Sequence, residues 1–518
     1  MNGGRVTPPG RLRRAVRSTF HSFVFATAPA LAFLVANMRQ LAVSPSEGAR
    51  TIISLATCNL FLLAVIAPLR GLSAGAVTLS SFYIIVSFYT VGYGVASALV
   101  PGIPEPMLAW VYVVGAAVAA LRLGRPARHA DRRYQTLNVA AATLLGVCAI
   151  MLALESHSWA RRRWAAVTTK LVREGPVQIK SPSEPPDIYY IVLDGFGRED
   201  VLRERYGVDL TPSLERLREL GWQIPARSRA NYSQTYLSLA AALNGMYLDP
   251  VAAVMRDSRD RRALHDVIQH SGPILALKQH GYRFRMLGSN TSVTRTHLLA
   301  DDCACRSEGL NEFENGLLTI TPWRALPLYG PTYGAHYRSI VSAFDWMGPK
   351  VSDGRPEIVL AHLILPHPPF VLDENGGPIV LRGPLVFGDG DHFGGTVAQY
   401  RAGYAKQVRY AMRRLVQFAE RVHARSGNAI VIVHGDHGPG AAYSHRSLAE
   451  ADVFERFPIF MGLRLGAPGA PVPDDLSPVN VFRVIFNARF GGAFELLPNR
   501  SYYSPWAAPY RLTEVPVQ

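Results

Sequence analysis

Charge is scarce in this sequence of 518 residues. Only 18% of the residues are charged while 48% are hydrophobic, which is a low charge content for a soluble protein. The net charge is +15, but there is no lysine-rich tract and no nucleic-acid-binding signature, so we expect no nucleic-acid partner. We attribute the excess of basic residues to a membrane topology, because such residues collect on the cytoplasmic side of membrane proteins.

Cysteine is also rare, with four in the whole chain. Cys58 and Cys148 lie inside apolar runs, where a thiol behaves as a small core residue. Cys303 and Cys305 are separated by one alanine, and a disulfide across so short a loop would be strained. The sequence therefore leaves the redox state of this pair open.

Long apolar runs are present only in the first third of the chain. Each approaches the ~20 residues that a helix needs to cross a bilayer, although the fourth is short. They cover roughly residues 20–38, 51–69, 75–99, 106–121 and 136–154. Five such runs in succession predict a membrane domain of five transmembrane helices at residues 19–155. No cleavage pattern in good register follows the first run, so we interpret it as an anchor and not as a signal peptide.

Arginines predict the orientation of this domain. They are concentrated in a basic tail at residues 1–18, at Arg70, and between residues 122 and 133. With the N-terminus in the cytoplasm, all three basic segments fall inside, as the positive-inside rule requires. Five crossings then place everything after residue 155 outside the cytoplasm. The expected location is the inner membrane, with an extracytoplasmic domain at residues 187–518.

Residues 156–186 connect the two parts. Arg161, Arg162 and Arg163 oppose the predicted orientation, but Trp159 and Trp164 beside them are typical of a helix that lies at the membrane interface. Residues 175–186 are rich in proline and polar residues, as in a linker.

Strands alternate with helices in residues 187–518. Predicted strands cover residues 187–193, 282–287, 357–365, 429–433 and 457–463. Predicted helices cover residues 211–221, 237–243, 272–281, 404–424 and 477–488. This alternation predicts an α/β domain with a mostly parallel sheet between helices. Residues 310–350 and 373–400 are expected to be long irregular loops.

Two of the predicted strands end in a carboxylate close to a glycine. Asp194 follows the strand at 187–193, and Asp436 and His437 follow the strand at 429–433. Binding crevices of open α/β sheets lie at the carboxyl ends of strands, and carboxylates and imidazoles are frequent metal ligands. Taken alone, an Asp-His pair after a strand is also compatible with a polar turn, but its repetition favours a metal site.

A third candidate element is a pair of hydroxyls before the helix at 237–243. Ser233 and Thr235 lie where helix N–H groups favour an anion, and a metal would activate such a hydroxyl as a nucleophile. An ordinary helix cap is the alternative interpretation.

Five stretches together resemble, in order, the alkaline phosphatase/sulfatase superfamily. They are IVLDGFG, TPSLERLRELG, QTYLSLAAALNG, LPHPPF and HGDHG, and they fall within residues 186–500. Within the superfamily, the likeness is greatest to membrane-anchored transferases, namely lipoteichoic acid synthases and lipid A phosphoethanolamine transferases. These enzymes also combine a membrane anchor with an external catalytic domain.

The resemblance implies roles for individual residues. The sulfatase nucleophile lies ten positions before a glycine, and counting back from Gly245 selects Thr235 over Ser233. His367, in LPHPPF, would bind the phosphoryl group or protonate the leaving group. One divalent metal ion, Mn or Zn in the transferases, would be held by Asp194, Thr235, Asp436 and His437.

The sequence also departs from the sulfatase pattern. Gly195 stands where sulfatases have a second acid, Thr235 cannot be converted to formylglycine, and Leu239 replaces an arginine. A true sulfatase is therefore not expected. The additional ligand pair of two-metal phosphodiesterases is absent too. We expect His362 to be a satisfied core histidine, and His434 could lie behind the metal ligands.

The resemblance implies a metal-dependent transfer of a phospho-headgroup, of the phosphoethanolamine or phosphoglycerol type. The donor would be a phospholipid, the intermediate a phosphothreonine, and the acceptor an envelope glycan or glycolipid. The alternatives are a phosphodiester or sulfate-ester hydrolase of the same superfamily, and a non-catalytic membrane scaffold. A transporter is disfavoured, because the apolar runs contain few ionisable residues.

Overall fold

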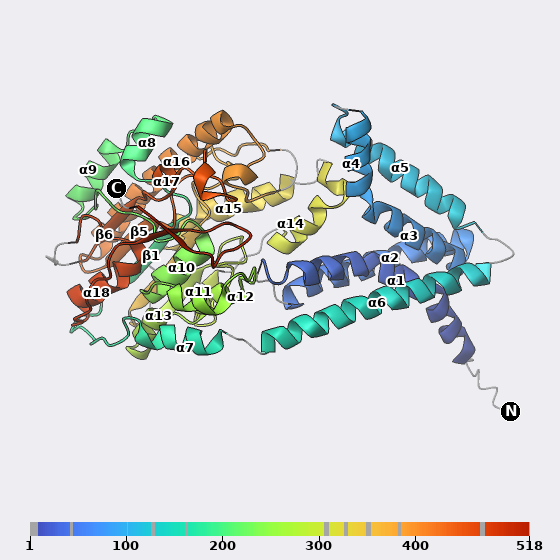
Figure 1. Cartoon of the computed structure of the whole chain (residues 1–518), viewed down its shortest axis with the longest axis horizontal. Coiled ribbons are helices and arrows are strands. Elements are labelled where there is room, and N and C mark those ends of the chain that lie inside the picture. The colour runs from blue at the N-terminus through green and yellow to red at the C-terminus, as the bar shows by residue number, and fades with distance from the viewer. Residues whose placement is uncertain are drawn as a thin grey trace.

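The protein consists of a bundle of apolar helices and an α/β domain that lie end to end (Figure 1). This arrangement comes from a computed structural model. It describes residues 9–41, 45–100, 102–125, 130–160, 164–304, 310–325, 330–348, 354–381, 385–466 and 472–516. Helix α1 begins at the end of the bundle that is remote from the α/β domain (Figure 1).

The bundle contains the five predicted apolar runs, and the third of them is broken into two helices. Its helices are α1 (Pro9–Asn37), α2 (Pro45–Arg70), α3 (Leu72–Ser87), α4 (Tyr89–Leu99), α5 (Glu105–Leu123) and α6 (Ala130–Ala160). Helix α1 packs against α2, α3 and α6, and α3 also packs against α5. Within the described ranges, four helices are long and apolar enough to cross a membrane, or five if the broken pair counts as one span.

The break between α3 and α4 has a local cause. The two helices are bent by 51°. The hydroxyl of Tyr112, on α5, donates a hydrogen bond of 2.8 Å to the carbonyl of Ile85. In a continuous helix that carbonyl would accept from the N–H of Tyr89, so a side chain has entered the helical hydrogen-bond ladder.

Helix α7 (Ala165–Glu174) joins the bundle to the α/β domain. It packs against three helices of that domain, α11 (Asp249–Met255), α12 (Arg262–Gln269) and α13 (Gly272–Gln279). Trp164 is buried in the core of the domain together with Leu171. Trp164 is therefore buried in protein, whereas the sequence predicted a tryptophan at the membrane interface. Arg161, Arg162 and Arg163 lie outside the described residues, as does the side chain of Trp159.

The α/β domain is built on a six-stranded sheet of order β3-β2-β4-β1-β5-β6. Its strands are β1 (Ile188–Leu193), β2 (Arg283–Leu287), β3 (Asp302–Ala304), β4 (Glu357–Leu363), β5 (Ile430–Gly435) and β6 (Met461–Arg464). Only β6 is antiparallel to its neighbour. The mostly parallel sheet predicted from the sequence is thus confirmed. A small antiparallel pair, β7 (Ser501–Tyr503) and β8 (Thr513–Val515), follows near the C-terminus.

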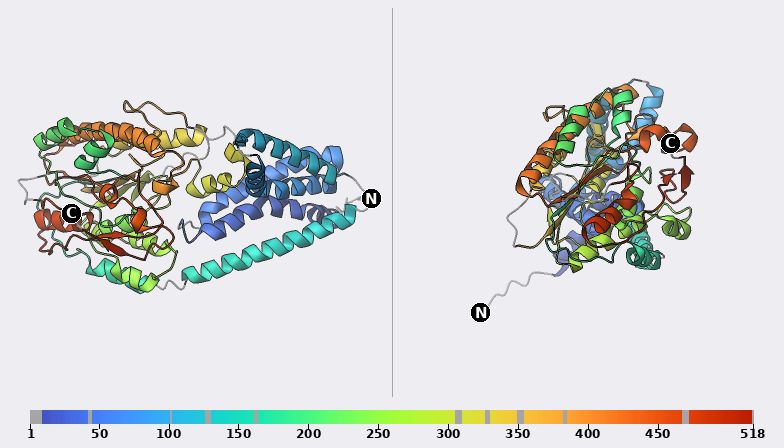
Figure 2. Two further views of the ribbon diagram at one scale, coloured as in Figure 1. Left: turned by 45° about the horizontal axis from the view of Figure 1, so that its top comes forward. Right: turned by 90° about the vertical axis from the view of Figure 1, so that its left-hand side faces the viewer.

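Helices cover both faces of this sheet, and each interface forms a separate apolar core (Figure 2). One core contains residues of α10 (Thr235–Asn244), α11 (Asp249–Met255), α12 (Arg262–Gln269), α13 (Gly272–Gln279) and α18 (Val481–Arg489). The other contains residues of α8 (Glu199–Tyr206), α9 (Thr211–Glu219), α15 (Gly330–Trp346) and α16 (Val397–Arg425). The short elements are α17 (Val453–Arg456), η1 (Pro322–Ala325), η2 (Gly390–His392), η3 (Leu448–Glu450) and η4 (Pro478–Asn480).

The segment 310–350 is more regular than predicted. It contains α14 (Glu312–Thr319), η1 and α15. Asn311 and Glu314 form a reciprocal capping box at the start of α14, which satisfies two N–H groups of the first turn. Because α14 is only eight residues long, its periodicity was too short to be recognised among the surrounding glycines and prolines.

The cysteines divide between the two parts. Cys58 and Cys148, in the bundle, are free thiols. Cys303, on β3, is disulfide-bonded. Cys305 lies outside the described residues.

Candidate metal centre and active site

The parallel pairing of β1 with β5 brings the two predicted carboxylates together. Leu193 and Gly435 are register partners at the carboxyl ends of these strands, and Asp194 and Asp436 follow them directly. Gly195 adopts φ +75°, a conformation that favours glycine, and its N–H donates to Asp436 Oδ1 at 2.9 Å. The turn after β1 thereby fixes the carboxylate after β5.

All four predicted metal ligands meet at this edge of the sheet. The Nε2 atom of His437 lies 3.5 Å from Asp194 Oδ1 and 3.4 Å from Asp436 Oδ2. The same nitrogen lies 3.2 Å from Thr235 Oγ1, at the first residue of α10. The sequence therefore predicted which side chains come together here, although they come from three separate elements.

The chemistry of these side chains fits a divalent metal ion. Asp194 Oδ1 and Asp436 Oδ2 are buried and have no hydrogen-bond partner within the described residues. His437 donates from Nδ1 to the carbonyl of Gly438 at 2.9 Å, so its Nε2 directs a lone pair towards both carboxylates. Two buried carboxylates and an imidazole lone pair would repel one another without a cation between them.

Imidazoles around Asp194 keep its carboxyl group ionised. Burial alone would raise the pKa of Asp194, but the charge of His367 and the contact with His362 outweigh burial and hold the pKa below its usual range. The closest contact joins His362 Nε2 to Asp194 Oδ2 at 3.3 Å. The other ring nitrogen of His362 pairs with Thr294 Oγ1 at 2.7 Å. His362 was expected to be only a core histidine, and that expectation is wrong, because it contacts a predicted ligand.

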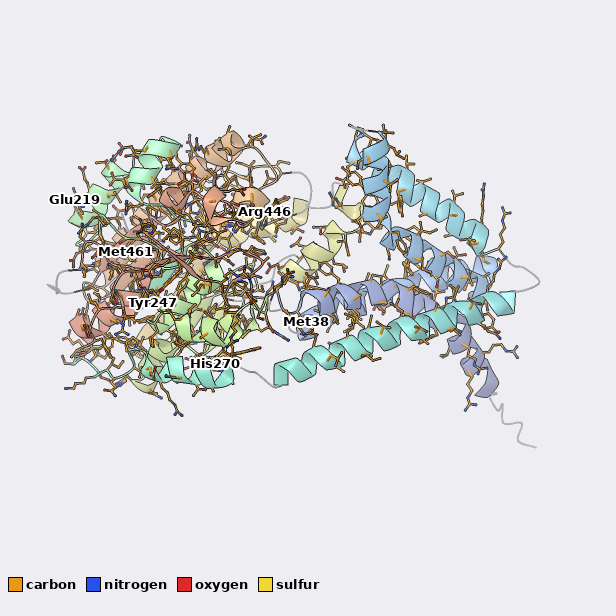
Figure 3. The ribbon with its side chains drawn as sticks, in the orientation of Figure 1. Met38, Glu219, Tyr247, His270, Arg446 and Met461 are labelled. Atoms are coloured by element: carbon orange, nitrogen blue, oxygen red, sulfur yellow. The ribbon has the colours of Figure 1, made fainter. Side chains whose placement is uncertain are left out.

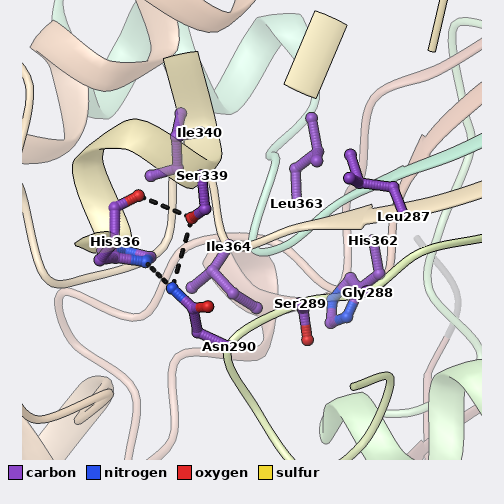
Figure 4. Close-up of a pocket in the computed structure, with 10 residues that line it drawn as sticks. All are labelled: Leu287, Gly288, Ser289, Asn290, His336, Ser339, Ile340, His362, Leu363 and Ile364. Atoms are coloured by element: carbon purple, nitrogen blue, oxygen red, sulfur yellow. Dashed lines mark hydrogen bonds between the residues drawn. The ribbon is translucent and has the colours of Figure 1, made fainter. Parts of the chain in front are cut away.

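A small cavity lies behind His362 (Figure 4). Its volume is about 20 Å³, which is room for roughly one water molecule. Asn290 joins its walls by hydrogen bonds to His336 Nδ1 at 3.2 Å and to Ser339 Oγ at 3.3 Å (Figure 4). Burial lowers the pKa of His336 to about 3, so this ring is neutral.

His434 occupies the equivalent position on the other side of β1. His362 and His434 are both register partners of Val192. The ring nitrogens of His434, however, lie 2.8 Å from the carbonyl of Gly435 and 3.0 Å from the hydroxyl of Tyr190. His434 is therefore satisfied by core partners and makes no hydrogen bond to a predicted ligand among the described residues.

A larger cavity of about 130 Å³ is lined by three of the four predicted ligands. His367, the fifth predicted site residue, lies in its wall together with Asp194, Thr235 and His437. The other residues of the lining include two charged ones that were not predicted from the sequence, Asp389 and Arg456. They belong to no recognisable motif, since Asp389 lies in a loop before α16 and Arg456 ends the four-residue helix α17.

Asp389 and Arg456 form a buried ion pair. The guanidinium also donates from Nε to the carbonyl of Ser233 at 3.0 Å, two residues before Thr235. Burial would raise the pKa of Asp389, but Arg456 and then His367 outweigh it and lower the pKa. The cavity lining therefore contains a fixed positive group, Arg456, directly beside the ionised carboxylate of Asp389.

His367 is oriented by two contacts. Its Nδ1 donates to the carbonyl of Pro368 at 2.7 Å, and its Nε2 lies 3.9 Å from Asp389 Oδ2. Burial lowers the pKa of His367, but the carboxylates of Asp194 and Asp389 outweigh this effect and raise it above its ordinary value. His367 is thus suited to hold a proton that it can donate inside the cavity.

Fold and site together define the class: an α/β enzyme domain with a divalent-metal site at its strand ends, attached to a bundle of membrane-type helices. The Sulfatase family model matches residues 186–456, which is more than half of the 518-residue chain. The chain therefore belongs to the sulfatase family, within the alkaline phosphatase/sulfatase superfamily, and is an enzyme. The resemblance stated from the motifs is confirmed.

Among solved structures, the chain is similar to the C-terminal periplasmic domain of EptC from Escherichia coli in complex with Zn. The identity is 14%, the TM-score 0.41, and the match covers 65% of this chain and 94% of that one. It is also similar to the integral membrane lipooligosaccharide phosphoethanolamine transferase A from Neisseria meningitidis, with 13% identity, TM-score 0.33, and coverage of 91% and 95%.

A third similar structure is the phosphonate monoester hydrolase of Agrobacterium radiobacter. Here the identity is 14%, the TM-score is 0.39, and the match covers 61% of this chain and 80% of that chain. No curated protein matches the chain.

Proposed function

We propose that this enzyme transfers a phospho-headgroup from a membrane phospholipid to an envelope glycan or glycolipid. The observation that carries the proposal is the convergence of Thr235, Asp194 and Asp436 on the Nε2 atom of His437, beside a cavity that Thr235, Asp194 and His437 line. Thr235 would act as the nucleophile. The headgroup would be of the phosphoethanolamine or phosphoglycerol type.

The metal ion would be held by Asp194, Thr235, Asp436 and His437. One ion, Zn or Mn, suits this set of oxygen and imidazole ligands. When bound, it would supply positive charge that favours the ionised form of a hydroxyl and neutralises phosphoryl oxygens. The absence of a formylglycine precursor at position 235 sets this chain apart from sulfate-ester hydrolysis of the sulfatase type.

The position of Thr235 at the start of a helix supports its proposed role as the nucleophile. It is the first residue of α10, where unpaired N–H groups and the helix dipole favour an anionic oxygen. Its oxygen would form a bond to the headgroup phosphorus while the bond from phosphorus to the diacylglycerol oxygen breaks. An acceptor hydroxyl would then give its proton to the now neutral His367 and form a bond to phosphorus, while the bond from phosphorus to Thr235 Oγ1 breaks and restores the starting enzyme.

His367 and Arg456 would handle the charge that develops in this reaction. His367, which holds its proton under the influence of Asp194 and Asp389, would donate it to the departing diacylglycerol oxygen. Arg456 would lie beside the phosphoryl oxygens as a fixed cation, because it is buried and oriented by Asp389. Both residues line the same cavity as Thr235.

The donor would come from the bilayer in which the bundle lies. We propose the orientation that the basic segments predict, with α1 beginning in the cytoplasm and the α/β domain outside the inner membrane. The disulfide at Cys303 supports this placement, because such bonds persist in oxidising compartments.

The test is headgroup transfer by the full-length protein in vesicles, with phospholipids that carry a labelled headgroup. Thr235→Ala should lose transfer by at least about 10³-fold, as expected for removal of a covalent nucleophile. Ser233→Ala, which removes the neighbouring hydroxyl, is the matched control and should keep activity. Transfer that persists in Thr235→Ala would refute the covalent route. Diacylglycerol release without any labelled acceptor would identify a hydrolase instead.

A further inference from the structure

Tyr236, which directly follows Thr235, forms a hydrogen bond to the membrane bundle. The hydroxyl of Tyr236 donates to the carbonyl of Leu41, just beyond the end of α1, at 3.2 Å. The ring of Tyr236 lines the catalytic cavity and is only 6% exposed. Met38, close to this contact, lies at the end of the bundle nearest the α/β domain (Figure 3).

Gln234, which directly precedes Thr235, is connected to the same segment through Arg261. Gln234 Oε1 accepts a hydrogen bond from Arg261 Nη2 at 3.3 Å. The backbone N–H of Arg261 donates to the carbonyl of Arg39 at 2.7 Å. Arg261 is 1% exposed, so water does not compete for these contacts. Both sequence neighbours of Thr235 therefore connect to residues 39–41, which we name the α1 clamp.

The α1 clamp has contacts with both the helical bundle and the α/β domain. The guanidinium of Arg39 pairs with Glu155 at the end of α6, with Nη2 2.7 Å from Oε1. Glu155 Oε2 also lies 3.5 Å from Nη2 of Arg262, the residue after Arg261. Met38 is buried against Phe313 of α14 in an apolar cluster shared by the bundle and the α/β domain.

Helix α14 supports the Tyr236 side of the clamp. The Oγ of Ser292 lies 2.8 Å from the hydroxyl of Tyr236. Ser292 in turn donates to Glu312 Oε2 from both its N–H and its hydroxyl, each at 2.8 Å. Because the hydroxyl proton of Ser292 goes to Glu312, the proton between Ser292 and Tyr236 must come from Tyr236. The single proton of Tyr236 thus faces two acceptors, Leu41 and Ser292.

We propose that the α1 clamp positions Thr235 for attack through Gln234 and Tyr236, so that the bundle contributes to catalysis and not only to anchoring. This inference rests on the proposed role of Thr235 as the nucleophile. A displacement of a reacting group by about 1 Å can cost about 100-fold in rate, so two tethers beside the nucleophile are enough to matter. Tyr236 is a positioning residue in this scheme, because it acts through its neighbour.

The experiment compares Tyr236→Phe with Tyr282→Phe in the full-length protein. Tyr282 is a matched control: it is 4% exposed and its hydroxyl donates to the carbonyl of Pro186 at 2.9 Å, far from the clamp in sequence. Three quantities are measured: hydrogen exchange of the amides in the first turn of α10, the metal content, and kcat and KM. The substrates are the labelled phospholipid and the soluble diester bis(4-nitrophenyl) phosphate.

Tyr236→Phe should accelerate exchange in the first turn of α10 and lower kcat about tenfold on both substrates, with KM and metal content unchanged. Tyr282→Phe should change neither. A purely structural role would lower stability without this separation of kcat from KM. Unchanged exchange in Tyr236→Phe would overturn the clamp, and so would faster exchange with an unchanged kcat.

Failure of the proposed function is distinguishable from failure of the clamp. If Thr235→Ala keeps the activity of the wild type, the nucleophile is wrong whatever Tyr236→Phe does. If Thr235→Ala is inactive while Tyr236→Phe matches Tyr282→Phe in every quantity, the nucleophile stands and the clamp is wrong.

Discussion

The bundle and the α/β domain both contain long apolar segments, and they bury them in opposite ways. In the bundle, large apolar side chains point outward, for example Leu69 at 82% exposed and Leu99 at 76%. In the α/β domain, every residue of β1, β4 and β5 is buried. The outward apolar side chains of the bundle are suited to contact with lipid, whereas the α/β domain buries its apolar side chains in its own core.

Charged residues also have different roles in the two parts of the molecule. Charges near one end of the bundle pair with the α/β domain: Arg50 with Glu314, Glu105 with Arg324, and Glu155 with Arg262. Charges at the strand ends of the α/β domain gather instead around the candidate metal centre. These three charged residues of the bundle therefore indicate docking, whereas those at the carboxyl ends of β1 and β5 indicate chemistry. Four substitutions test this distinction.

The largest effect is expected at the metal centre. Asp436→Ala should lose the bound metal and reduce activity by at least about 10³-fold, because one of two buried carboxylate ligands is gone. Elemental analysis of the full-length protein measures the metal. The control is Asp391→Ala, in a second Asp/His cluster whose carboxylate is exposed. Loss of metal in Asp391→Ala but not in Asp436→Ala would place the metal at that second cluster.

The next effect concerns the buried charge pair in the cavity wall. Arg456→Gln leaves Asp389 buried without its cation, which should cost about 3–5 kcal/mol of stability and most of the activity. Thermal unfolding and headgroup transfer measure the two effects. Arg446→Gln is the control, because Arg446 is 76% exposed and pairs with the partly exposed Asp391. A variant of Arg456 as stable as this control would show that Asp389 is not held ionised.

A smaller effect is expected behind the metal ligands. Thr294→Val removes the hydroxyl that pairs with His362 and so loosens the ring that contacts Asp194. Removal of such a supporting contact typically costs 10- to 100-fold in metal affinity, so we expect about tenfold weaker Zn binding. Titration of metal-free protein with Zn measures it. Thr321→Val, whose hydroxyl bonds only the nearby carbonyl of Leu318 among the described residues, should bind Zn as the wild type does.

The smallest effect is expected where the bundle meets the α/β domain. Burial would raise the pKa of Glu314, but hydrogen bonding to Arg50 outweighs it and lowers the pKa. Its stabilising contribution is therefore present above the ordinary glutamate pKa of about 4.3 and is lost as pH falls through the lowered value. Because Arg50 is half exposed, Glu314→Gln should cost only about 1 kcal/mol.

The measurement for Glu314→Gln is the unfolding temperature at neutral pH and at low pH. The difference from the wild type should be present at neutral pH and shrink as the pH falls. Glu420→Gln, at an exposed pair with Arg216, is the control and should show a smaller difference. A difference that grows at low pH would mean that Glu314 is not ionised in the folded protein.

The sequence by itself determined the two-part organisation, the mostly parallel sheet and the identity of the four residues that meet at the metal centre. These features depend on local patterns: runs of apolar residues, alternation of strands with helices, and motifs of a known family in order. A carboxylate directly after a buried strand must lie at the edge of the sheet, whatever the rest of the chain does.

Only the tertiary structure decided which other residues reach the site. Asp389 and Arg456 arrive through packing between elements that are distant in sequence, and no local pattern distinguishes them from ordinary core residues. Tyr236 is next to Thr235 in the sequence, but only the tertiary structure brings its hydroxyl to Leu41. The sequence alone could not distinguish His362 from His434 either, because both are register partners of Val192 on β1. Only His362 contacts a predicted ligand, because the partner of each ring depends on the neighbouring loop and helix and not on the strand that carries it.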